Sequence, residues 1–215
     1  MKSGDRKPLF HFMTRIRMLG AALHVLKHFL SIQELCRTLI KYMFLQRKDP
    51  WIHMSPAVDK KDKGSRAQLR DAFMIYKALC HVIEPTKAIQ VTKSIIKAAA
   101  LEFLRGTLPV IDRDEIESLD ASGRVNLLAR LLDKFPNSDW QLVETGEKKF
   151  VIHVTRCRFP ELLQHLDLDF LSSAFCSADI EYFQKFQPDV HVERPWTIAK
   201  GHQWCEFQFR LGDDL

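Results

Sequence analysis

Residues 157–210, CRFPELLQHLDLDFLSSAFCSADIEYFQKFQPDVHVERPWTIAKGHQWCEFQFR, decide the fold of this chain. Apolar residues alternate along 204–211, which is the two-residue period of a half-buried strand, and 190–199 is also expected to be extended. Gly201 and His202 are expected to form the turn between these two segments. Three short helical segments precede the strands: 160–166, 168–175 and 179–186.

A second pair of strands is expected before this stretch. Apolar and polar residues alternate from Trp140, and Phe150, Ile152 and Val154 alternate on the return segment. Gly146 lies between the two segments, where a turn is needed. The pattern predicts a β-hairpin.

Helical patterns fill the chain before residue 136. Apolar residues recur at helical spacing from Leu9 to about Gln46, and Ser31 followed by Glu34 is a capping-box pattern that predicts a second helix start. Further helices are expected over 66–84, 86–105 and 122–134. Helices followed by strands are typical of an α+β protein. We therefore predict an α+β fold, with N-terminal helices packed on a C-terminal antiparallel sheet of about four strands with inserted helices.

The N-terminal third differs from the rest in charge. Residues 1–66 hold 14 Lys and Arg against 5 Asp and Glu, whereas the remainder holds 18 against 22. We interpret the basic excess as solvated helix surface, and expect no nucleic-acid partner. Residues 49–65, with two prolines, a glycine and alternating charges, favour a linker. The expected division is a basic helical segment with linker over 1–65 and an α+β domain over 66–215, forming one structural unit. Homo-oligomers would form through the N-terminal helices.

Composition favours an ordinary soluble protein. The chain has 215 residues, 46% hydrophobic and 27% charged, which is enough to bury a sizeable core. Its five cysteines are odd in number and widely spaced, so reduced thiols and a cytoplasmic location are expected. Because no uninterrupted apolar run of about 18 residues occurs, we predict no transmembrane helix.

Cys176 and Asp179 form the first candidate site. They lie three residues apart and would share one helix face. If Cys176 lies near a helix start, the helix N-terminus would lower the pKa of its thiol and favour a nucleophilic thiolate, beside a carboxylate that manages a proton. The same spacing also fits a buried thiol next to a capping aspartate.

Arg194 stands alone in an apolar extended segment. A buried arginine needs an anionic partner, which is either a substrate carboxylate or a structural acid such as Asp179 or Glu206. Cys205 faces the same side as Phe207, where it is either core or pocket lining. His202, in the preceding turn, is a candidate general base or a surface residue.

A metal site is the alternative use of the cysteines. Cys157, Cys176 and Cys205 would together supply three thiolates for zinc or iron. Their spacing gives no support to this alternative, so we expect no metal cofactor.

The order of these residues resembles one family. Cys157, Phe175-Cys176-x-x-Asp179, Arg194, Cys205 and Phe207 occur in the order of the L-2-amino-thiazoline-4-carboxylate hydrolase family. The remaining matching positions are Pro188, Thr197, Ala199, Gly201 and Phe209. The chain also looks distantly like vinyl-reductase-type small-molecule-binding domains. It departs from the hydrolase pattern at His202 and Glu206, and the departure at His202 implies a change in proton handling.

The resemblance implies hydrolysis of a C–N bond in a small cyclic amidine, in sulfur amino-acid or secondary metabolism. Attack would fall on the ring carbon between nitrogen and sulfur, and the substrate would carry a carboxylate. The residues expected to act are Cys176, Asp179 and His202 in catalysis, and Arg194, Cys205 and Thr197 in substrate binding. Two other classes fit the same residues: a module that binds a metal or small ligand, and a biosynthetic enzyme that uses the scaffold for another reaction.

Overall fold

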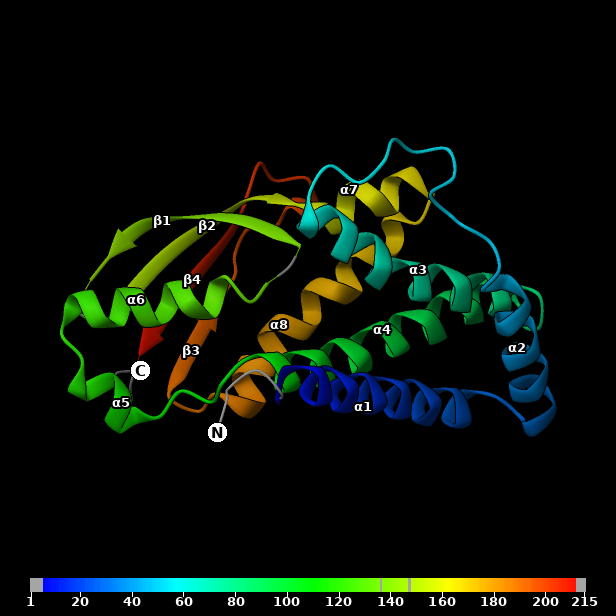
Figure 1. Cartoon of the computed structure of the whole chain (residues 1–215), viewed down its shortest axis with the longest axis horizontal. Helices are drawn as coiled ribbons and strands as arrows, with labels where there is room; N and C mark the ends of the chain where they lie inside the picture. Colours follow the sequence, from blue (N-terminus) through cyan, green and yellow to red (C-terminus); the bar gives the residue numbers. More distant parts are fainter. Residues whose placement is uncertain (1–5, 136, 147, 212–215) are drawn as a thin grey trace.

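The computed structural model describes residues 6–135, 137–146 and 148–211, and confirms an α+β fold (Figure 1). Helices occupy the first half of the chain, and a four-stranded sheet with further helices occupies the second. The helices are α1 (Arg6–Phe29), α2 (Ile32–Leu45), α3 (Lys60–Cys80), α4 (Pro85–Thr107), α5 (Arg113–Ser118), α6 (Ala121–Leu132), α7 (Arg158–His165) and α8 (Ser172–Phe186), with short 3₁₀ turns η1 (Asp169–Leu171) and η2 (Ile198–Lys200). The strands are β1 (Ser138–Thr145), β2 (Lys149–Cys157), β3 (Val190–Glu193) and β4 (Cys205–Leu211).

The sheet is antiparallel, with strand order β1-β2-β4-β3. Its two hairpins meet where β2 pairs with β4, and this register sets Val154 opposite Cys205 and Ile152 opposite Phe207. Because side chains alternate along a strand, the register gathers the apolar residues of both strands on one face. The same face therefore presents Cys205 at the end of β4.

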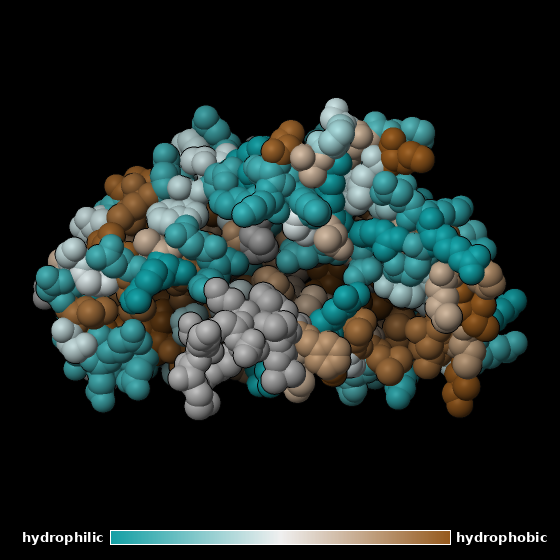
Figure 2. All heavy atoms as spheres, viewed as in Figure 1, coloured by the Kyte–Doolittle hydropathy of each residue, from teal (hydrophilic) through white to brown (hydrophobic). Residues whose placement is uncertain are grey.

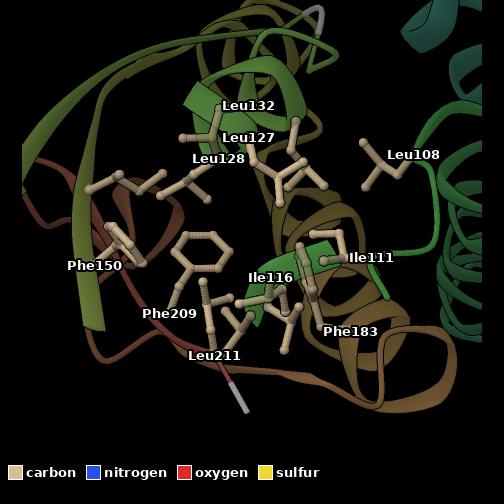
Figure 3. Packing of buried hydrophobic residues seen from close by; sticks show 14 of the residues in the cluster. Leu108, Ile111, Ile116, Leu127, Leu128, Leu132, Phe150, Phe183, Phe209 and Leu211 are labelled. Carbon is tan, nitrogen blue, oxygen red and sulfur yellow. The ribbon is translucent and has the colours of Figure 1, made fainter. Parts of the chain in front are cut away.

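Helices α6 and α8 cover this face of the sheet (Figure 1). In Figure 3 the side chains of Leu132, Phe150, Phe209 and Phe183 point toward one another from α6, β2, β4 and α8. Phe183 and Phe209 meet edge to face, with ring centroids 5.6 Å apart. This cluster fixes α8 across the sheet and so fixes the residues that α8 carries.

The helical half packs around α4. Its first helix, α1, lies along α4, where Leu26 packs against Val91 and Ile95. Gly106 of α4 is buried beneath Thr14 of α1, and a Cβ added to this glycine would overlap the Thr14 side chain. The absence of a side chain at residue 106 therefore allows the two helices to approach closely.

Buried residues form separate clusters instead of one continuous core. One fills the space between the sheet, α6 and α8, a second joins α3, α7 and the start of α8, and a third joins α1, α3 and α4. Protein interiors are normally packed without large voids. Leu26, Ile96 and Phe209, one from each of these clusters, line the cavity described below.

The structure confirms the predicted start of α2 and corrects the predicted start of α3. Ser31 caps α2 with the predicted capping box, because its side chain accepts from Glu34 N while Glu34 accepts from Ser31 N. The predicted linker over 49–65 is too long, since α3 begins at Lys60. Asp59 caps that helix by accepting from Asp62 N at 2.6 Å.

Three further boundaries differ from the expectation. The segments predicted at 168–175 and 179–186 become one helix, α8, after a short 3₁₀ turn. Regular pairing of the predicted 190–199 strand ends at Glu193, because only β3 finds partners on β4. No helix was expected between 105 and 122, where the acidic run 112–120 contains the short helix α5, capped by Asp112.

Candidate functional site

A cavity of about 760 Å³ runs from the helical half to the sheet. Its walls come from α1, α3, α4 and α8 and from the apolar face of β2 and β4. In Figure 2 the surface is hollowed between α1 and α3, and the floor of the hollow is hydrophobic. Pockets of about 300–1,000 Å³ are the size at which proteins bind small organic ligands.

The end of the cavity near the sheet is polar. It is lined by Cys157, Cys176, Asp179, Arg194 and Cys205, which come from β2, α8, the segment after β3, and β4. The structure therefore brings together four of the six residues expected at the site and the third cysteine of the metal alternative.

Arg194 is the best-held side chain of this end. It is 9% exposed, and its Nη1 lies 3.0 Å from Asp179 Oδ2, while its Nη2 donates to the Cys176 carbonyl at 2.7 Å. The guanidinium also stands over the Phe207 ring at 5.2 Å. Its buried Nε has no hydrogen-bond partner among the described residues.

Asp179 is the carboxylate of this polar end, and 23% of its side chain is exposed. Burial raises the pKa of this carboxyl to about 6, although the charge and hydrogen bond of Arg194 lower it in part. At neutral pH the group is mainly ionised and its pKa lies close to the working pH. Such a carboxylate is suited to accept a proton during a reaction.

The thiols of the cavity are neutral at physiological pH. Burial raises the pKa of Cys176 and of Cys157 to about 12, with Asp179 adding to the effect on Cys176, and burial also raises the pKa of Cys205. The sequence-based expectation of a lowered Cys176 pKa is therefore wrong. Cys176 lies in the second turn of α8, and desolvation outweighs any help from the helix N-terminus.

Two of the predicted site residues lie outside the cavity wall. His202 is exposed in the turn after Gly201, and its ring meets Trp196 at a centroid distance of 4.7 Å. Thr197 is buried, and its carbonyl accepts from Lys200 N and His202 N. It shapes the turn before β4, from which Ile198 N donates to Cys205 Sγ at 3.2 Å.

Most of the cavity wall was not anticipated from the sequence. Ala99, Ala100 and Phe103 of α4 and Trp140 of β1 line it, together with several residues of α1. The three alanines at 98–100 are the one signal that predicts a thinly covered helix face. A lining made by five or more distant segments leaves no local pattern.

A second set of polar residues lies on β2 and β4, at strand positions that alternate with the residues lining the cavity. His153 Nε2 stands 3.2 Å from Glu206 Oε2, and the His153 ring stacks on Trp204 with centroids 4.7 Å apart. None of the three residues lines the cavity. Glu206 is therefore not the partner of Arg194, which pairs with Asp179.

Within ranges 6–135, 137–146 and 148–211, no group of three or more His, Cys, Asp or Glu side chains is arranged to hold a metal ion. In the same ranges, no helix has both the length and the apolar character that crossing a bilayer requires.

The fold and the cavity define a class of protein: an α+β protein with a large cavity that ends at an Arg–Asp pair beside three thiols. The family model for L-2-amino-thiazoline-4-carboxylic acid hydrolase matches residues 65–209, more than half of the chain. The chain belongs to that family. No curated protein matches it. The match covers α3 to β4 and leaves α1 and α2 outside it.

Proposed function

We propose that the protein is a hydrolase that opens a small cyclic amidine of the 2-aminothiazoline-carboxylate type, in sulfur amino-acid or secondary metabolism. Family membership supports the reaction class. The observation that carries the proposal is the convergence of Cys176, Asp179, Arg194 and Cys205 on one end of a single cavity.

In the proposed reaction Asp179 acts as the general base. Its carboxylate takes a proton from a water molecule while the water oxygen bonds to the ring carbon between nitrogen and sulfur. Asp179 passes this proton to the ring nitrogen. When the ring C–N bond breaks, the remaining hydroxyl proton moves to the departing nitrogen through Asp179, and the carbon–oxygen bond becomes a carbonyl. One water is consumed, and the product is a carbamoyl-cysteine type compound.

Arg194 is the proposed anchor for the substrate carboxylate. Two of its nitrogens already contact Asp179 and Cys176, so the substrate would bind at the N–H groups that these two contacts leave unused. Its contacts to α8 also hold Asp179 in place relative to the bound acid. Positioning of this kind lowers the entropic part of a barrier.

Cys176 and Cys205 are proposed to line the reacting centre as neutral thiols. A pKa of about 12 makes the Cys176 thiolate rare at neutral pH, which favours water as the nucleophile. The other route, attack by Cys176 after Asp179 has taken its proton, would give a covalent intermediate.

The test is a ring-opening assay with L-2-amino-thiazoline-4-carboxylate, followed by mass spectrometry of the product. We expect the wild type to form the opened product, Asp179→Asn to lose about 10²–10⁴-fold in rate, and Cys176→Ala to retain activity. Asp169→Asn, at an exposed aspartate of η1, is the matched control. If the wild type forms no product, the proposal is overturned. If Cys176→Ala loses activity, the nucleophile is the Cys176 thiol and not water.

A further inference from the structure

The cavity is much larger than the proposed head group needs. One small ring bearing a carboxylate fills a minor part of about 760 Å³, a volume within the range of sites that hold drug-sized ligands. A substrate that occupies only the polar end would leave the rest of the space without a partner. Unfilled space of this size is uncommon, because protein interiors pack to near crystal density.

Charge is confined to the two ends of the cavity. Asp179 and Arg194 lie at the end near the sheet, and Arg15 and Asp71 lie at the end formed by α1 and α3. Asp71 is already held there, because it accepts from Tyr42 Oη at 3.1 Å. Arg15 is exposed, whereas the Arg194 side chain is 9% exposed, so Arg194 is the better shielded cation for an anionic ligand.

The wall between the ends is hydrocarbon. Ile95, Ile96, Ala99, Ala100 and Phe103 line it from α4, opposite Leu26 of α1. Apolar cavities of this kind stay dry and bind apolar ligands. The two alanines matter most, since larger residues at their positions would fill the space from the α4 side.

The mouth of the cavity is apolar as well. Leu19, Leu23 and Leu39 line it and are exposed, whereas Cys205, Phe209 and Arg194 at the other end are buried. The hollow between α1 and α3 in Figure 2 lies at this exposed end. An apolar tail that extends from the polar end would thus pass along α4 and end near α1.

We propose that the substrate is an amphiphile, with a carboxylate-bearing head at Arg194 and a long hydrocarbon tail in the apolar length between α1 and α4. The identity of the head group rests on the proposed function. The hydrocarbon tail is supported independently, by the apolar cavity wall between α1 and α4. Burial of each methylene then adds to affinity until the tail fills the cavity.

The test uses equilibrium binding of saturated carboxylates from hexanoate to hexadecanoate, measured by displacement of a fluorescent fatty-acid analogue. We expect affinity to rise about fourfold for each added methylene and then to level off. Hexadecan-1-ol should bind at least tenfold more weakly than hexadecanoate, because it lacks a charge for Arg194.

Two variants locate the tail. Ala99→Phe and Ala100→Phe each place a ring in the apolar length, and both should weaken hexadecanoate binding by at least tenfold. Ala98→Phe is the matched control, because Ala98 precedes them on α4 and does not line the cavity. Circular dichroism of all three variants checks that a loss of binding is not a loss of folding.

The outcomes separate this inference from the proposed function. Binding without dependence on chain length, or equal binding in the filling variants and the wild type, would overturn the amphiphile. A wild type that opens the small ring but binds no long carboxylate also overturns it and leaves the proposed function standing. A wild type that binds the long carboxylates but opens no cyclic amidine would support the hydrocarbon tail and overturn the proposed reaction.

Discussion

Removal of Arg194 tests the buried ion pair at the polar end of the cavity. Arg194→Met keeps an apolar stem of similar length but removes the guanidinium, which stands over the Phe207 ring and pairs with Asp179 at 3.0 Å. The Asp179 carboxylate is then left unpaired. Breaking a buried pair from one side costs about 3–5 kcal/mol of folding free energy, which for a chain of this size lowers Tm by about 10 °C.

The loss of folding free energy caused by Arg194→Met should depend on pH, because the pKa of Asp179 depends on Arg194. Burial already raises the pKa of Asp179 to about 6, and Arg194 opposes that rise, so without Arg194 the pKa rises further. A group whose pKa is higher in the folded than in the unfolded state loses stabilisation as pH rises through the folded value. The destabilisation by Arg194→Met should therefore be larger at pH 8 than at pH 5, where Asp179 can be protonated.

Urea unfolding followed by circular dichroism at both pH values measures this difference. Arg156→Met is the matched control, because its pair with Glu161 is exposed and should contribute less than about 1 kcal/mol. The double variant Asp179→Asn with Arg194→Met should be less destabilised than the sum of the two single variants. A loss below about 1 kcal/mol for Arg194→Met, or a larger loss at pH 5, would refute the account of the pair.

Three further predictions follow from the same packing. Gly106→Ala should destabilise the fold by about 1–3 kcal/mol in thermal unfolding, because the new Cβ overlaps Thr14; a neutral effect would mean that α1 is free to shift from α4. At pH 7.5 an aromatic disulfide reagent should modify exposed Cys36 quickly and Cys157, Cys176 and Cys205 slowly, and rapid reaction of Cys176 would contradict its raised pKa. We also propose that homo-oligomers form through α1 and α2, where Ile32 is 82% and Met43 71% exposed. Light scattering should give a multiple of the monomer mass for the wild type and a lower mass for the double variant Ile32→Glu with Met43→Glu. A monomeric wild type would contradict this.

Local patterns were sufficient for much of the fold. Ser31 and Glu34 predicted the start of α2, and the alternation of Cys205 and Phe207 predicted β4 and the face it presents. These features depend on residues within a few positions of one another. The start of α3 was missed because Asp59, which caps it, lies inside a charged segment typical of a linker.

The sequence predicted which residues form the polar end of the site but not their ionisation states. The family motif put Cys176, Asp179 and Arg194 together, yet their ionisation depends on burial by segments far away in sequence. The apolar length was not predictable at all, because α1, α4 and β1 each contribute only a few side chains to it. The amphiphile proposal therefore depends on the three-dimensional structure.

The pH dependence of kcat/KM for ring opening tests the central claim most directly. With Asp179 as the base, kcat/KM for L-2-amino-thiazoline-4-carboxylate should rise with pH and level off above an apparent pKa of about 6. Asp179→Asn should be at least about 100-fold slower and should lose this step. A wild-type profile that is flat between about pH 5 and 8, or an Asp179→Asn variant as active as the wild type, would contradict the assignment of Asp179.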